Sequence, residues 1–306
     1  MTSFDRGLSR NSAEHLRSKR LELSTLEIPE GRGWAPMKQK VAETLTGTPE
    51  RIGGVIDRLV SVQSIMDALP PSPLQNRVSA FNQLYLKITR RVDGALATAT
   101  SPGFLELLDI EFAKRYFAAL TLWNDDNPDT PDVWEVLFKR AGDMELSRLM
   151  AAVLGVNAHI NHDLSLALIS TWEKVGVPGE DDPIHPDYLL VNDIFYEEIP
   201  ILRQSFSDQW QLDLDHMVGG LDDWSQRILV RVTRAHAWEQ GLDLWKLKDN
   251  PKDFEQARFT MDRAASLLAE FAIGGDRLIN DAGDAWDRLR RVFDGDDDAE
   301  KDTGKQ

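Results

Sequence analysis

The chain has no cysteine, no long apolar run and few basic residues for its length. Without cysteine, disulfide bonds, zinc–thiolate sites and thiol catalysis are excluded. The first twenty residues contain no apolar signal core, and stretches such as LMAAVLGV are far shorter than the roughly 18 residues that a membrane span needs. The sequence therefore predicts a cytoplasmic protein with no membrane span.

The shortage of basic residues gives the chain a formal charge of −16 at pH 7, from 51 acidic and 35 basic residues. A surface this acidic disfavours nucleic acids and anionic membranes as the main partners. An anionic small substrate would need bridging metal ions or a local group of arginines. The 42% hydrophobic content of the 306 residues is enough to bury a substantial core.

Alternating strand patterns are also missing, whereas helical periodicity runs through nearly the whole chain. Residues 144–175 are apolar almost all round, which is typical of a helix at the centre of a fold. We expect an all-α class, with a single helical bundle domain of about eight to ten helices at residues 31–292. A partly disordered segment at 1–30 and a disordered acidic tail at 293–306 would flank it. The oligomeric state is not indicated.

An acidic cluster follows one of the predicted helices, in the run LTLWNDDNPDTPDVW at residues 120–134. The Asn-Pro pair should end the helix near Asp125 or Asp126, where carboxylates repel one another and oppose the helix dipole. Mg²⁺ bound by Asp125, Asp126 and Asp129 would remove both problems. Arg115 lies three turns earlier on the same face as Asp126. A solvated acidic loop is the alternative.

The central helix carries polar residues in the stretch NAHINHDLSLAL. His159, His162 and Asp163 project from one side, and Asn157 and Asn161 from the other. An unpaired buried polar group costs about 1–3 kcal/mol, so these side chains need partners. They could form a buried hydrogen-bond network between helices. They could also be the floor of an active site, including one in which the first three bind zinc or iron.

Two further patterns could hold a charged ligand. In HPDYLLVNDIFYEEIP, four side chains could turn toward a shared cation, those of Asn192, Asp193, Tyr196 and Glu197. A solvent-facing helix flank would look much the same. A single helical stripe brings guanidinium groups and then indole rings to one face, at Arg227, Arg231, Arg234, Trp238 and Trp245. Guanidinium groups bind phosphate oxygens, and indole faces stabilise carbocations. Surface ion pairs and core packing are the alternative roles.

The segments NQLYLKITRRV, FAKRYFAAL, NAHINHDLSLAL and HPDYLLVN resemble a largely uncharacterised all-helical family of bacteria and fungi, over roughly residues 50–290. That family is similar to the atypical fungal humulene synthases, class I-like sesquiterpene cyclases that act on farnesyl diphosphate with Mg²⁺. The resemblance implies a class I terpene-synthase-like bundle. It also implies that Asp125, Asp126 and Asp129 correspond to the aspartate-rich metal motif.

The second metal motif of ordinary class I cyclases, Asn-Asp-x-x-Ser/Thr-x-x-x-Glu, is incomplete in this chain. NDIFYEEIP begins like it but has Tyr196 in the Ser/Thr place and Pro200 in the Glu place. The second metal group would therefore come from Asn192 and Asp193, or from Asn161 and Asp163.

The sequence and the resemblance together predict a magnesium-dependent sesquiterpene cyclase. It would ionise farnesyl diphosphate, cyclise the carbocation to a humulene-type hydrocarbon and release diphosphate. The expected substrate contacts are Arg115, Arg231, Arg234, Trp238 and Trp245. The expected catalytic residues are His159, His162 and Asp163, on the floor of the site. The alternatives are a non-catalytic helical binding protein for an apolar ligand, and a zinc or iron metalloenzyme built on His159, His162 and Asp163.

Overall fold

The computed structural model describes residues 38–68, 76–143, 145–179, 184–206 and 221–273, and in α9 and α11 it leaves out the side chains at 199–200, 202–206 and 221–232. The predicted segments 1–30 and 293–306, and both ends of the predicted 31–292 domain, lie outside the described residues. Those boundaries stay predictions.

Within these ranges the chain is helical and contains no strand, which confirms the predicted all-α class and agrees with the expected eight to ten helices. The elements are α2 (Lys38–Thr44), α3 (Ile52–Asp67), α4 (Arg77–Ala95), α5 (Pro102–Asn124), α6 (Asp132–Phe138), α7 (Arg148–Ala158), the π-helix η2 (His159–Asp163), α8 (Leu164–Val175), α9 (Ile184–Phe206), α11 (Leu221–Leu247) and a helix at 251–273.

Local sequence signals account for several helix ends. The Asn76 side chain caps α4 by accepting hydrogen bonds from the backbone N–H groups of Val78 and Ser79. Pro102 opens α5, where its missing N–H is not needed. The same helix ends at Asn124, just before the Asn-Pro pair, as the sequence predicts, and Asp126 then takes a left-handed φ of 53°.

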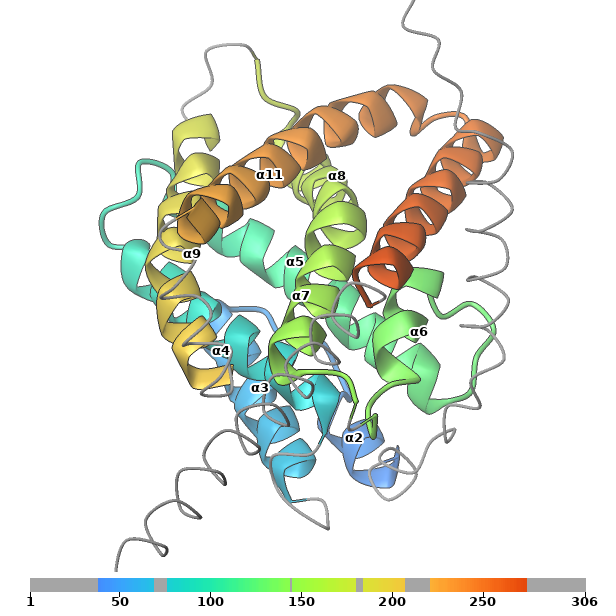
Figure 1. Ribbon diagram of the computed structural model, residues 1–306. Helices are drawn as coiled ribbons and strands as arrows, with labels where there is room; N and C mark the ends of the chain where they lie inside the picture. Colours follow the sequence, from blue (N-terminus) through green and yellow to red (C-terminus); the bar gives the residue numbers. More distant parts are fainter. Residues whose placement is uncertain (1–37, 69–75, 144, 180–183, 207–220, 274–306) are drawn as a thin grey trace, which may run out of the picture.

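The segment predicted as one central helix is instead α7, η2 and α8 in succession, and it runs through the middle of the bundle (Figure 1). It packs against α4 and α5 on one side, and α11 crosses it on the other. The π-helix is the five residues His159–Asp163, a widened turn that often occurs at functional sites. The predicted polar cluster therefore sits where the helix geometry changes.

Close packing fixes how α4 meets α7. A Cβ atom added at Gly155 would lie 2.2 Å from Cγ of Phe81, so only glycine fits against that ring. The absence of a side chain at Gly155 thus lets the two helices approach closely.

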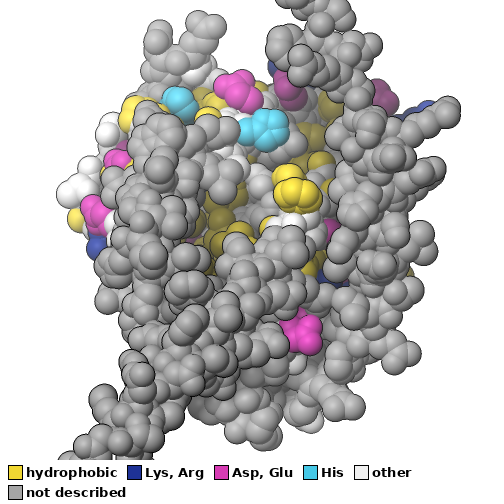
Figure 2. Space-filling model, viewed as in Figure 1, with side chains coloured by type: hydrophobic (Ala, Val, Ile, Leu, Met, Phe, Trp, Pro, Cys, Tyr) yellow, Lys and Arg dark blue, Asp and Glu magenta, His cyan; other side chains and the backbone are white. Residues whose placement is uncertain are grey.

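The surface carries most of the charge. On the face shown in Figure 2, acidic side chains of the described residues are spread over the surface and are not gathered into one patch. None of the helices in the described part of the chain is long and apolar enough to cross a membrane.

Candidate functional site

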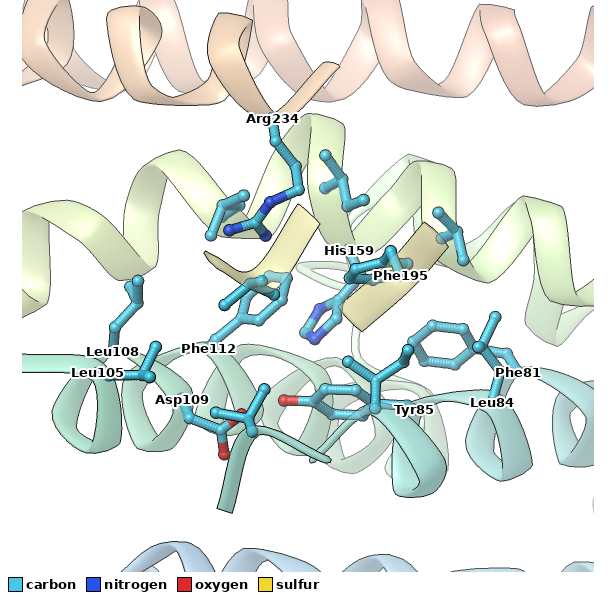
Figure 3. A pocket seen from close by; sticks show the side chains of 16 residues that line it. Phe81, Leu84, Tyr85, Leu105, Leu108, Asp109, Phe112, His159, Phe195 and Arg234 are labelled. Atoms are coloured by element: carbon cyan, nitrogen blue, oxygen red, sulfur yellow. The ribbon is translucent and has the colours of Figure 1, made fainter. Parts of the chain in front are cut away.

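A cavity lies at the centre of the bundle, between α4, α5, the α7–η2–α8 segment, α9 and α11 (Figure 3). It is narrow, with a volume of about 40 Å³. Its walls are mostly aromatic and aliphatic, and four polar side chains interrupt them. The lining residues are Phe81, Leu84, Tyr85, Ile88, Val92, Leu105, Leu108, Asp109, Phe112, Val156, His159, Ile160, Leu164, Val191, Phe195 and Arg234.

The π-helix places a buried carboxylate between two imidazoles. Nδ1 of His159 lies 3.0 Å from Oδ2 of Asp163, and Nδ1 of His162 lies 2.9 Å from Oδ1. The indole Nε1–H of Trp134 donates a third hydrogen bond to Oδ2, at 3.0 Å. All three members of the His–Asp–His cluster are 2–3% exposed. The predicted hydrogen-bond network between helices is therefore present, and it ties α6 to the central segment.

This network sets the charges of the cluster. Burial alone would raise the pKa of Asp163, but the hydrogen bonds from His159 and His162 outweigh burial and hold its pKa below the usual range. Burial lowers the pKa of His159, and the contribution of Asp163 only partly offsets this. The carboxylate of Asp163 is therefore ionised, and His159 is a neutral imidazole that donates its Nδ1–H to Asp163.

His159 lines the cavity, and its second ring nitrogen is unsatisfied. Its Nε2 is buried and has no hydrogen-bond partner among the described residues, and the same holds for Nε2 of His162. The His159 ring stacks on Phe112, with 3.4 Å between ring centroids, and meets Tyr85 edge-on at 4.5 Å. A neutral imidazole held in this way offers a hydrogen-bond acceptor, or a base, to whatever occupies the cavity.

The same geometry does not favour a metal centre at this cluster. Both imidazoles turn Nδ1 toward Asp163, so the oxygens of Asp163 are taken up by N–H donors and the free Nε2 atoms belong to separate rings. In the described part of the chain, no group of three or more His, Asp or Glu side chains is arranged to hold a metal ion. Zinc or iron bound by His159, His162 and Asp163 gains no support from this arrangement.

Sequence reasoning missed two polar residues of the cavity, Asp109 and Tyr85. Asp109 is 7% exposed, and its Oδ2 has no hydrogen-bond partner among the described residues. Burial, reinforced by the negative charges of Asp93 and Glu106, raises the pKa of Asp109 to about 8. The Tyr85 hydroxyl lies near that of Thr89, but neither makes a well-formed hydrogen bond.

Arg234 enters the cavity from α11 on the side opposite Asp109 (Figure 3). Its Nε donates to Oδ1 of Asn192 at 2.7 Å, and one terminal nitrogen donates to the backbone carbonyl of Tyr188 at 3.0 Å. The guanidinium also lies over the Tyr188 ring, 4.5 Å from its centroid. These contacts join α11 to α9 and occupy the Asn192 amide, while the neighbouring Asp193 is exposed.

The predicted aspartate cluster lies away from the cavity. Asp125, Asp126 and Asp129 are exposed at and beyond the C-terminus of α5, and Asp126 forms an ion pair with Lys38. The last α5 residue that lines the cavity is Phe112, and thirteen helical residues at about 1.5 Å each place Asp125 about 20 Å farther along the axis. The structure does not bring these aspartates to the cavity wall.

Other predicted site residues have structural partners elsewhere. Arg115 donates to the Ser170 hydroxyl at 2.6 Å, in the contact between α5 and α8. The Asn161 amide donates to Asn157, whose own amide donates to the carbonyl of Ala265 in the 251–273 helix.

The predicted arginine–tryptophan stripe divides along α11. Trp238 is buried against Trp172, Tyr188 and His185, and Trp245 is half-buried against Trp172. Neither indole is among the cavity-lining residues. The side chains of Arg227 and Arg231 lie outside the described residues, so of the stripe only Arg234 is placed at the cavity.

Comparison with known proteins identifies a family. No curated protein and no solved structure matches the chain. One family model matches residues 52–274, a range that contains every residue lining the cavity and the whole His159–Asp163 segment. Because this match spans well over half of the chain, the protein belongs to the family of unknown function DUF5995.

Proposed function

We propose that this protein binds an apolar small molecule in its central cavity. The observation that carries the proposal is the wall of that cavity, where aromatic rings of Phe81, Phe112 and Phe195 and several aliphatic side chains surround only four polar groups. Small-molecule sites are typically concave and mostly apolar, with a few placed polar groups, and the lining of this cavity has that character. Side chains must move to widen the open space of about 40 Å³ when a ligand enters. A cavity of this kind between five helical segments is unusual in a close-packed core, where voids are few and small.

Displacement of a neutral fluorescent probe tests this proposal. N-phenyl-1-naphthylamine should fluoresce when it enters the cavity, and apolar competitors should displace it. Leu108→Phe, which adds volume at the cavity wall, should weaken probe binding at least about tenfold. Leu59→Phe, at a buried site in α3 that does not line the cavity, is the matched control, since overpacking alone costs about 1–3 kcal/mol of stability at either site. Equal loss of binding in both variants would contradict the proposal.

A second candidate is the sesquiterpene cyclase that the sequence resemblance implies. It is favoured by one observation, the presence of Arg234 together with the aromatic rings in one cavity, because guanidinium groups bind phosphate and ring faces stabilise carbocations. The aspartates that the resemblance assigns to Mg²⁺ do not fit this cavity, being exposed and about 20 Å farther along α5.

The cyclase proposal has a direct assay. Purified protein is incubated with geranyl, farnesyl and geranylgeranyl diphosphates, with Mg²⁺ or with EDTA, and the extracts are separated by gas chromatography–mass spectrometry. A Mg²⁺-dependent hydrocarbon that is lost in Arg234→Lys would support a cyclase. Recovery of every substrate intact, from protein that still binds the fluorescent probe, would leave binding alone as the function.

A further inference from the structure

We propose that the cavity recognises a neutral oxygen atom, that of a ketone or an alcohol, on an otherwise apolar ligand, through Asp109, Tyr85 and His159. This inference rests on the proposed binding function and names the chemistry of the ligand's polar end. The three side chains come from three different elements, α5, α4 and η2, and all three line the cavity (Figure 3).

The three residues share an unusual property, an unsatisfied polar atom in a buried wall. The Tyr85 hydroxyl, Oδ2 of Asp109 and Nε2 of His159 are buried and without hydrogen-bond partners among the described residues. In Figure 3 the Tyr85 hydroxyl points toward the Asp109 carboxyl, and the His159 ring lies next to the Tyr85 ring. An unsatisfied buried polar atom is unfavourable, so a ligand that satisfies one should bind more tightly than a hydrocarbon of the same shape.

The protonation states define what the three groups can bond. The raised pKa of Asp109, about 8, makes it a neutral carboxylic acid and a hydrogen-bond donor at pH 7. Burial also raises the pKa of Tyr85, which keeps its hydroxyl protonated. His159 donates Nδ1–H to Asp163, and Nε2 is left as an acceptor. Two donors and one acceptor match a ketone, which accepts from both donors, or an alcohol, which also donates to His159.

The charged groups around Asp109 disfavour an anion at this end of the cavity. Asp93 on α4 and Glu106 on α5 add negative potential behind the carboxyl group. The cation of the cavity, Arg234 on α11, lies on the opposite side, where Asn192 and the Tyr188 carbonyl already bond it. A diphosphate placed against Asp109 would meet repulsion and would have to break the Arg234 contacts to be neutralised.

Ligands with the same C15 skeleton and different ends give the first test. Farnesene, farnesol and farnesyl diphosphate are compared as competitors of N-phenyl-1-naphthylamine at pH 6.5. We expect farnesol to bind about tenfold tighter than farnesene, the effect of one well-made buried hydrogen bond, and farnesyl diphosphate to bind more weakly than farnesol. Equal binding of farnesene and farnesol, or tighter binding of the diphosphate, would overturn the inference. Failure of all three to displace the bound probe would also overturn the inference, whereas failure of the probe itself to bind would refute the proposed binding function.

The second test assigns the effect to Asp109, with geranylacetone as a ketone probe. Binding to the native protein should weaken about tenfold between pH 6.5 and 9.5, as Asp109 loses the proton that it donates. Asp109→Asn keeps an N–H donor, so its binding should not change with pH. Asp109→Leu should prefer farnesol over farnesene less strongly than the native protein does, because only Tyr85 and His159 remain to bond the hydroxyl. Glu173→Gln, on the exposed face of α8, should behave as the native protein.

Thermal unfolding of each variant shows whether it is folded before its binding is compared. If Asp109→Asn lost affinity with rising pH just as the native protein does, another group would be responsible and the inference would be wrong. If the preference for farnesol survived undiminished in a folded Asp109→Leu variant, Asp109 would not take part in recognition, and the inference would again be overturned.

Discussion

Replacement of Asp109 by Asn should stabilise the protein, and the gain should grow with pH. The folded-state pKa of Asp109 is about 8, compared with an ordinary value of 3.8. Between these values the folded state holds a proton that the unfolded state has released. The contribution of the Asp109 proton to the free energy of unfolding is therefore fully present below about pH 4 and is lost progressively as the pH rises toward 8.

The size of this loss of stability follows from the difference between the folded and unfolded pKa values of Asp109. A difference of about 4 pH units at about 1.36 kcal/mol per unit gives an upper bound of about 6 kcal/mol, reached above pH 8. Only part of the transition lies between pH 5.0 and 8.5, and water entering the cavity will reduce the cost of the charged form. We therefore expect the stability advantage of Asp109→Asn to increase by about 2–4 kcal/mol between pH 5.0 and pH 8.5.

Urea unfolding followed by tryptophan fluorescence measures this difference, with both proteins examined at both pH values. Asp93→Asn removes one of the charges that raise the pKa of Asp109, so the loss of stability should be smaller and should end at a lower pH. Glu173→Gln, at an exposed position, should leave the pH dependence unchanged. A constant difference between Asp109→Asn and the native protein across this pH range would refute the buried, protonated carboxyl.

Three further substitutions test other parts of the structure. Gly155→Ala should lower the free energy of unfolding in urea by about 1–3 kcal/mol, because its Cβ would meet Phe81. Gly53→Ala, with open space around it, should be neutral or slightly stabilising. Equal effects would contradict the close approach of α4 and α7. Asp163→Asn should lower the free energy of unfolding by about 3–5 kcal/mol at pH 7. The native protein should lose stability on acidification below about pH 4, and the variant should lack this loss; an acid titration followed by tryptophan fluorescence measures it. Asp126→Asn should change stability by less than about 0.5 kcal/mol and leave probe binding intact, because the side chain is exposed; loss of probe binding would connect the acidic loop to the cavity.

Patterns that depend on near neighbours in the sequence predicted the structure well. The Asn-Pro pair indicated the end of α5 to within a residue or two, and the spacing of His159 and Asp163 indicated that they share a helix face. The π-helix was not predicted, since one additional residue in a helical turn leaves no mark on hydrophobic periodicity. The π-helix acts locally: it lets His159 and His162 both reach the carboxylate of Asp163.

Properties that depend on which helices pack together could not be predicted in the same way. Asp109 follows two leucines in ELLDIEF and looks like an ordinary acid on an amphipathic helix, with Glu106 one turn before it. It is buried because α4 and the central segment cover that face of α5. The sequence does not distinguish Asp109 from Glu106 one turn earlier, and the burial of Asp109 becomes evident only when the covering helices are known.

The two buried carboxyl groups of the site, Asp109 and Asp163, show why overall charge was a poor guide to the ligand. Both are almost fully buried, yet the pKa of Asp163 is lowered and that of Asp109 is raised. Three N–H donors surround Asp163, whereas Asp109 faces the negative charges of Asp93 and Glu106. Environments that push two pKa values apart in this way are how proteins keep one carboxyl ionised and another protonated at the same pH. The formal charge of −16 therefore describes the surface, while the cavity presents a neutral acid, a neutral imidazole and one guanidinium that is already bonded. That local inventory, more than the net charge, favours a neutral oxygenated ligand over an anion.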